Sequence, residues 1–139
     1  MRWLLVLVWA GAIFVLTCNA SFRGLVESGM VRFEWDPQPM FGQLLDPLPE
    51  RMSSDFLMQK LGHITAFFIL TALLQTKLQS NKVILLVAIS YAILTELLQL
   101  YFARDGRLFD VGFDTVGALL ALAAESLFTK LGARQSIQK

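Results

Sequence analysis

Residues 96–117 read ELLQLYFARDGRLFDVGFDTVG, and here charged side chains interrupt an otherwise apolar part of the chain. The flanking apolar segments, about 83–101 and 109–129, are each long enough to cross a bilayer as a helix. Polar side chains end the first segment, occupy the loop and begin the second: Glu96, Gln99, Arg104, Arg107, Asp110 and Asp114. We therefore expect the function of the chain to lie at this turn between two membrane helices.

The composition is that of a membrane protein. Of the 139 residues, 55% are hydrophobic, and the mean hydropathy is +0.58. A formal net charge of +1 without a basic run gives no reason to expect nucleic acid. With Cys18 as its one cysteine and His63 as its one histidine, the chain is not expected to form an internal disulfide, bind a metal or carry a cofactor.

The pattern of apolar segments predicts an all-α membrane protein with four transmembrane helices in a single domain spanning residues 1–139. The predicted helices cover about 3–20, 56–74, 83–101 and 109–129. The first segment has two interpretations. Its short length and the sequence Cys18-Asn19-Ala20 also fit a cleaved signal peptide, but a retained helix completes an even number of spans, and we favour retention.

Residues 21–55 differ in composition from the predicted helices. They contain all four prolines and most of the acidic residues that lie outside residues 96–117, together with many apolar side chains. We interpret them as an extracytoplasmic segment between helices one and two. It could form a short interfacial helix or cap over the membrane domain, or a loosely packed loop.

Lysine and arginine near the ends of the predicted helices fix the expected orientation. The cations of the two chain ends and of the connection around Lys77 and Lys82 fall on one side of a four-span arrangement. By the positive-inside rule this side is cytoplasmic, so both termini are predicted to be cytoplasmic and the loop with Arg104 and Arg107 is predicted to be outside.

The same arrangement brings Lys60 and His63, three residues apart in the second predicted helix, to the level of the polar turn. Carboxylates inside a membrane need cationic partners, and these side chains supply them. The predicted ligand-binding residues are Lys60, His63, Glu96, Gln99, Arg104, Arg107, Asp110 and Asp114.

The order K-x-x-H, E-x-x-Q, R-x-x-R and D-x-x-x-(N/D)-x-x-G over about residues 55–125 resembles the VanZ-like family of small bacterial integral membrane proteins. This chain has Gln59 where the family usually has Asp, and Asp114 where it usually has Asn. The resemblance implies a multi-pass protein of the bacterial cytoplasmic (inner) membrane. It also implies a link to the cell envelope and to antibiotic resistance, because the member that named the family is associated with resistance to the glycopeptide teicoplanin.

The residues leave three functions open. Arg104 and Arg107 suit the binding of an anionic envelope or lipid-linked ligand, because guanidinium groups form paired hydrogen bonds to phosphate and carboxylate. Alternatively, the chain is a membrane hydrolase or transferase acting on a lipid phosphate or ester, with His63 as general base and Glu96 or Asp110 orienting it. A third possibility is an accessory subunit that packs against a larger membrane-protein partner in the bilayer.

Overall fold

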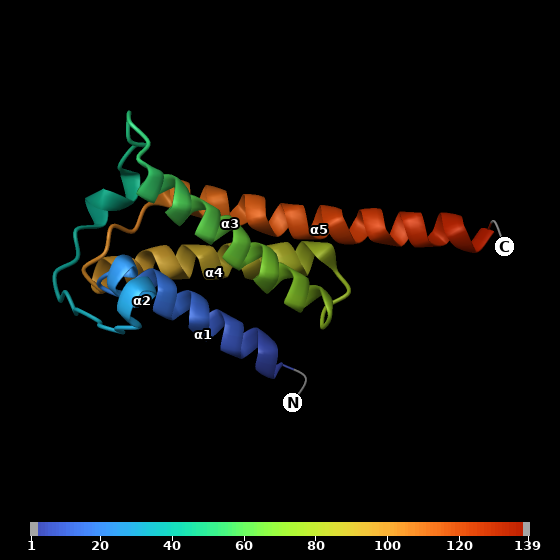
Figure 1. Ribbon diagram of the computed structural model, residues 1–139, viewed down its shortest axis with the longest axis horizontal. Coiled ribbons are helices and arrows are strands. Elements are labelled where there is room, and N and C mark those ends of the chain that lie inside the picture. Colours follow the sequence, from blue (N-terminus) through green and yellow to red (C-terminus); the bar gives the residue numbers. More distant parts are fainter. Residues whose placement is uncertain (1–2, 138–139) are drawn as a thin grey trace.

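The computed structural model describes residues 3–137, and helices are its only regular secondary structure over this range (Figure 1). Five are α-helices and one is a short 3-10 helix, η1. In chain order they are α1 (Leu4–Cys18), α2 (Phe22–Ser28), η1 (Phe41–Leu45), α3 (Ser54–Gln75), α4 (Asn81–Tyr101) and α5 (Leu108–Ile137). The prediction of an all-α protein is confirmed for these residues.

Three helices are long and apolar enough to cross a membrane: α3, α4 and the part of α5 from Leu108 to Leu131. At about 1.5 Å per residue, α3 and α4 are roughly 32 Å long, close to the thickness of the hydrocarbon core. The 15 residues of α1 reach only about 22 Å. The predicted fourth span is thus a shorter apolar helix, and its passage across the membrane stays a prediction.

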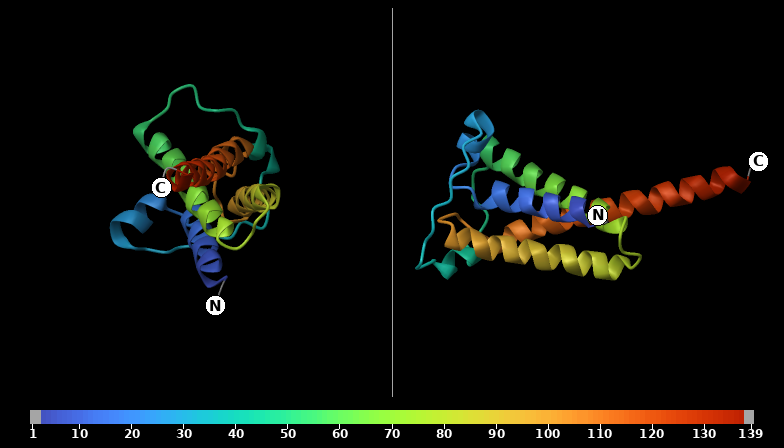
Figure 2. Two further views of the ribbon diagram at one scale, coloured as in Figure 1. Left: turned by 90° about the vertical axis from the view of Figure 1, so that its right-hand side faces the viewer. Right: turned by 90° about the horizontal axis from the view of Figure 1, so that it is seen from below.

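The helices form a bundle in which α3 and α5 make the most extensive contact and α4 packs beside α5 (Figure 2). A close approach of backbones makes this contact possible. A Cβ atom at Gly117 of α5 would overlap the carbonyl oxygen of Ile64 in α3, whereas a Cβ at Gly112 meets nothing within 4 Å. Of these two α5 glycines, therefore, Gly117 permits the helix packing and Gly112 does not contribute to it.

Although short, α1 is an integral part of this bundle. Ile13 is fully buried in the hydrophobic core. The Trp9 indole Nε1 donates a hydrogen bond to the carbonyl oxygen of Ala66 in α3 (2.9 Å), and the Tyr91 hydroxyl of α4 donates one to the carbonyl oxygen of Ala10 (2.6 Å). Loss of α1 would expose this core; retention of this helix stays a prediction.

The segment between α1 and α3 covers one end of the bundle. Asn19 is fully buried, and its side chain accepts a hydrogen bond from the backbone N–H of Arg32 and donates one to the carbonyl oxygen of Ser21. Farther along, Trp35 stacks on Tyr101 at the end of α4 with ring centroids 5.5 Å apart. Of the two interpretations of this segment, the cap fits these contacts better than the loosely packed loop.

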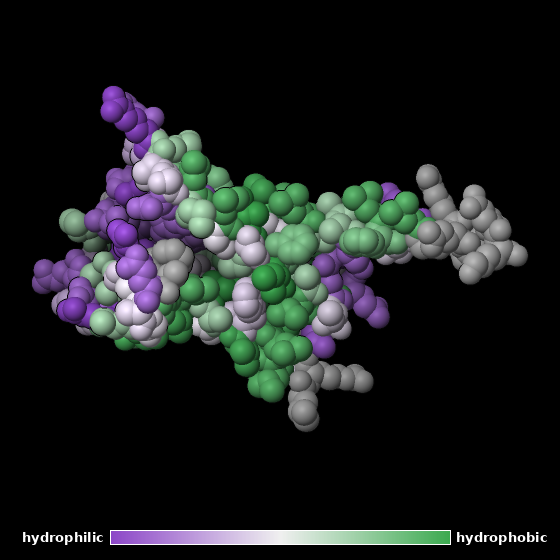
Figure 3. Space-filling view, in the orientation of Figure 1, coloured by the Kyte–Doolittle hydropathy of each residue, from purple (hydrophilic) through white to green (hydrophobic). Residues whose placement is uncertain are grey.

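The two ends of the bundle differ in polarity. The beginning of α1, the α3–α4 turn and the end of α5 lie at one end, and the cap and the α4–α5 turn lie at the other (Figure 1). Figure 3 shows hydrophilic residues gathered at the capped end and a hydrophobic surface over the helices beside it. The capped end is the one predicted to be extracytoplasmic; Arg2 and Lys139, two of the cations behind that prediction, lie outside the described residues.

Cysteine labelling tests this orientation. In a Cys18→Ala background, Gln79→Cys in the α3–α4 turn is expected to react only with a membrane-permeant maleimide, and Asp105→Cys in the α4–α5 turn with an impermeant one applied to intact cells. Both positions are exposed, so neither substitution disturbs the core. Impermeant labelling of position 79 but not 105 would reverse the predicted topology.

Candidate functional site

Three helices bring the eight predicted residues to the capped end of the bundle. Lys60 and His63 lie one turn apart on α3, and Glu96 and Gln99 one turn apart near the end of α4. The two arginines come from the α4–α5 turn and the two aspartates from the start of α5. Six of the eight are buried; the arginine side chains are partly exposed.

Lys60 forms a buried ion pair with Asp110. The Nζ–Oδ1 distance is 2.5 Å, and only 6% and 3% of the two side chains are exposed. The ammonium group also lies 4.8 Å from the ring centroid of Phe56 and 5.1 Å from that of Phe109, where cation–π attraction adds to the pairing. The charge of Lys60 is therefore compensated within the protein.

One turn deeper, His63 Nδ1 lies 2.9 Å from Asp114 Oδ1. Asp114 is fully buried, and its other oxygen, Oδ2, has no hydrogen-bond partner among the described residues. In an enzyme, a carboxylate that is hydrogen-bonded to one ring nitrogen orients a histidine general base. In a purely structural pair, the same contact compensates the charge of a buried acid. The residue that orients His63 is thus Asp114, in place of the expected Glu96 or Asp110.

Glu96 is held by a side-chain amide and by backbone. Gln99 Nε2 donates to Oε1 (2.7 Å), and the backbone N–H of Arg107 donates to Oε2 (2.8 Å). The turn lies so close to α4 that a Cβ at Gly106 would overlap the carbonyl oxygen of Glu96. The carboxylate therefore fixes the turn that carries both arginines, without using their guanidinium groups.

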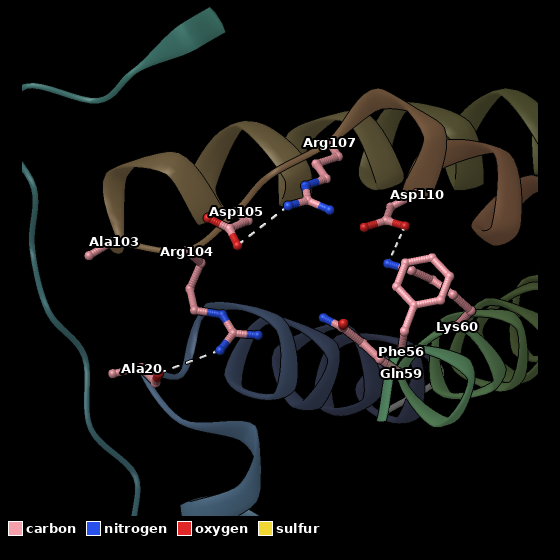
Figure 4. Close-up of a pocket in the computed structure, with 9 residues that line it drawn as sticks. All are labelled: Ala20, Phe56, Gln59, Lys60, Ala103, Arg104, Asp105, Arg107 and Asp110. Carbon is pink, nitrogen blue, oxygen red and sulfur yellow. Dashed lines mark hydrogen bonds and ion pairs between the residues drawn. The ribbon is translucent and has the colours of Figure 1, made fainter. Parts of the chain in front are cut away.

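A polar cavity of about 200 Å³ opens beside these groups (Figure 4). Its lining residues are Ala20, Phe56, Gln59, Lys60, Ala103, Arg104, Asp105, Arg107 and Asp110. Arg104 Nη1 is 3.4 Å from the carbonyl oxygen of Ala20, and Arg107 Nη2 is 3.6 Å from Asp105 Oδ2. The Nε atoms of both arginines are buried without a hydrogen-bond partner among the described residues. Two guanidinium groups with few partners among the described residues therefore line the cavity.

The eight predicted residues take different places around this cavity. Lys60, Arg104, Arg107 and Asp110 line it. His63 lines a neighbouring apolar cavity, and Glu96, Gln99 and Asp114 lie behind the walls in the buried network. The first four are therefore directly accessible from the cavity, and the last three hold the surrounding network in place.

Sequence reasoning missed several lining residues. Phe56 and Gln59 precede Lys60 by four residues and by one, so the helical spacing of α3 already places Phe56 on the face of Lys60. Ala20 contributes a backbone carbonyl from the end of α1. No residue pattern indicates such a contribution, because any residue type supplies a carbonyl.

His63, Glu96 and Asp114 could also hold a metal ion. Each offers one ligand atom, and these atoms lie within 4.8 Å of one another in a buried place. Imidazole and carboxylate are ligand types that divalent transition metals accept. The expectation of no metal stays a prediction.

A bundle of apolar helices with a buried polar network at one end defines a multi-pass helical membrane protein. The VanZ/LLP1 family matches residues 2–129, and the chain belongs to this family. It is 36% identical over 118 residues to the "uncharacterized membrane protein YwnJ" of Bacillus subtilis (strain 168), and the match covers 84% of each chain. No solved structure matches the chain significantly. The VanZ-like resemblance is thereby confirmed.

Proposed function

We propose that the polar cavity binds the anionic group, phosphate or carboxylate, of an envelope or lipid-linked ligand at the outer face of the cytoplasmic membrane. The observation that carries this proposal is that the side chains of Arg104 and Arg107 line the cavity with few partners among the described residues. Both guanidinium groups line the cavity, and each has a buried Nε without a partner among the described residues. A bound anion would pair with the two guanidinium groups that line the cavity.

The charges around the cavity favour an anion. Three cationic and two acidic side chains line it. Lys60 and Asp110 neutralise each other at 2.5 Å. Asp105 is 71% exposed and 3.6 Å from Arg107, so water screens this contact and it is worth little. Arg104 forms no ion pair with any described residue.

The alternative is that the polar residues only neutralise one another and hold the helices together. A purely structural role does not explain the two arginine side chains. The two carboxylate oxygens of Glu96 accept hydrogen bonds from Gln99 and from the backbone of Arg107, and from neither guanidinium group. The buried acids Asp110 and Asp114 have Lys60 and His63 as partners. Neither guanidinium group forms an ion pair with a buried carboxylate among the described residues.

The predicted orientation determines which side of the membrane the cavity faces. With the capped end outside, the cavity faces the cell envelope, where phosphate-bearing and carboxylate-bearing lipids are ligands of suitable charge. A contribution to teicoplanin resistance through such an envelope component is the role that the family resemblance suggests for this chain.

Arginine-to-lysine substitutions test the proposal. Arg104→Lys and Arg107→Lys keep the charge but remove the planar fork, and each is expected to weaken binding of glycerol phosphate about tenfold, as the loss of one charge-assisted hydrogen bond implies. The measurement is a calorimetric titration of the purified protein in detergent. Arg51→Lys, at an exposed position of the cap segment, is the matched control. Equal affinities in all four proteins would refute an arginine-based anion site.

A further inference from the structure

A second cavity, of about 60 Å³, lies between α1 and α3 and is apolar. Ile13 and Leu16 of α1 form one wall, and Gly62, Ala66 and Phe67 of α3 form the other. Such a cleft between two membrane helices suits hydrocarbon and offers little to a soluble anion.

The apolar cleft adjoins the polar cavity. Gln59 and Arg104 line both of them. The same two residues also border a larger, open hollow of about 680 Å³ between α2 and the start of α3. Three spaces of different character therefore meet at Arg104: a polar cavity, an open hollow with room for a headgroup, and an apolar cleft between helices.

We propose that the ligand of this site is a membrane lipid with an anionic headgroup, which Arg104 and Arg107 hold while the hydrocarbon chain leaves through the cleft between α1 and α3. This inference rests on the proposed function. It adds that the ligand is an amphiphile and enters sideways from the bilayer, because the cleft adjoins Arg104 and lies between two apolar helices.

The surface beside the cleft fits a hydrocarbon chain. Leu16, which lines the cleft, is 37% exposed, and Met58, which lines the neighbouring open hollow, is 65% exposed. A volume of about 60 Å³ holds only a short part of a chain. The remainder would lie along this exposed surface, where other lipid chains surround it.

Filling the cleft tests the inference. A Cβ at Gly62 meets nothing within 4 Å, so Gly62→Leu can fold and place its side chain where the hydrocarbon would lie. Gly112→Leu is the matched control, because it is an exposed helical glycine with the same open space. The probes are soluble glycerol phosphate and phosphatidylglycerol in nanodiscs. Gly62→Leu is expected to weaken phosphatidylglycerol binding about tenfold and to leave glycerol phosphate binding unchanged, and Gly112→Leu to change neither.

The outcomes separate this inference from the proposed function. If Gly62→Leu affects neither probe, or both equally, while Arg104→Lys weakens both, the lipid inference is overturned and the anion site stands. If Arg104→Lys affects neither probe, the proposed function itself fails. Should Gly62→Leu not fold, Leu16→Trp fills the cleft from α1, and Leu7→Trp, at a 67% exposed position of the same helix, is its control. Unchanged phosphatidylglycerol binding by Leu16→Trp would likewise overturn the inference.

Discussion

Replacing Lys60 with methionine is expected to lower the free energy of unfolding by about 3–5 kcal/mol, the typical cost of breaking a buried ion pair. The substitution leaves Asp110 charged and without its cationic partner in a place where 3% of its side chain is exposed. The neighbouring rings of Phe56 and Phe109 cannot replace the lost cation, because the faces of aromatic rings are negative. Reversible unfolding in detergent, followed by circular dichroism, measures the effect.

A double variant distinguishes the loss of pairing from the loss of packing. Lys60→Met with Asp110→Leu removes both charges and keeps apolar volume, so it is expected to recover most of the lost stability. The exposed pair Arg23–Glu27, 82% and 62% exposed, provides the control, and Arg23→Met is expected to cost less than about 1 kcal/mol. A double variant as unstable as Lys60→Met would mean that the charge of Asp110 is not the cause.

The membrane helices could be predicted because length and hydropathy are local properties of the sequence, and the polar residues because they interrupt the apolar segments. The apolar segments around residues 83–101 and 109–129 match α4 and the spanning part of α5 within a few residues, since length and hydropathy determine membrane spans. The pairing of partners could also have been derived. Lys60 and His63 lie one turn apart on α3, Asp110 and Asp114 one turn apart on α5, and the two helices run in the same direction, so the pairs form in register.

Other features depend on how closely segments approach one another in space, which the residue pattern does not give. That Glu96 binds the backbone of Arg107, and not a guanidinium group, follows from how closely the turn approaches α4. The stacking of Trp35 on Tyr101, which attaches the cap, joins residues 66 positions apart. The apolar side chains in residues 21–55 indicate that this segment packs against another part of the protein. They do not indicate which residues it contacts.

The in-register pairing requires α3 and α5 to lie close together, and Gly117 makes this possible. Gly117→Ala is expected to destabilise the protein by about 1–3 kcal/mol, because the added methyl group overlaps the backbone carbonyl of Ile64 and the helices must separate. Ile64 directly follows His63, so the separation should also lengthen the contact between His63 and Asp114. Thermal unfolding in detergent measures the stability.

Gly112→Ala is the control that makes this result specific. Both glycines lie inside α5, so alanine improves helix propensity at each by up to about 1 kcal/mol. At Gly112 the new methyl group meets open space, and this variant should be as stable as the parent or more stable. The difference between the two variants therefore reports the α3–α5 contact alone. If both substitutions raise stability equally, the helices do not approach as closely as the geometry at Ile64 requires, and the in-register pairing of Lys60 and His63 with the two aspartates loses its structural basis.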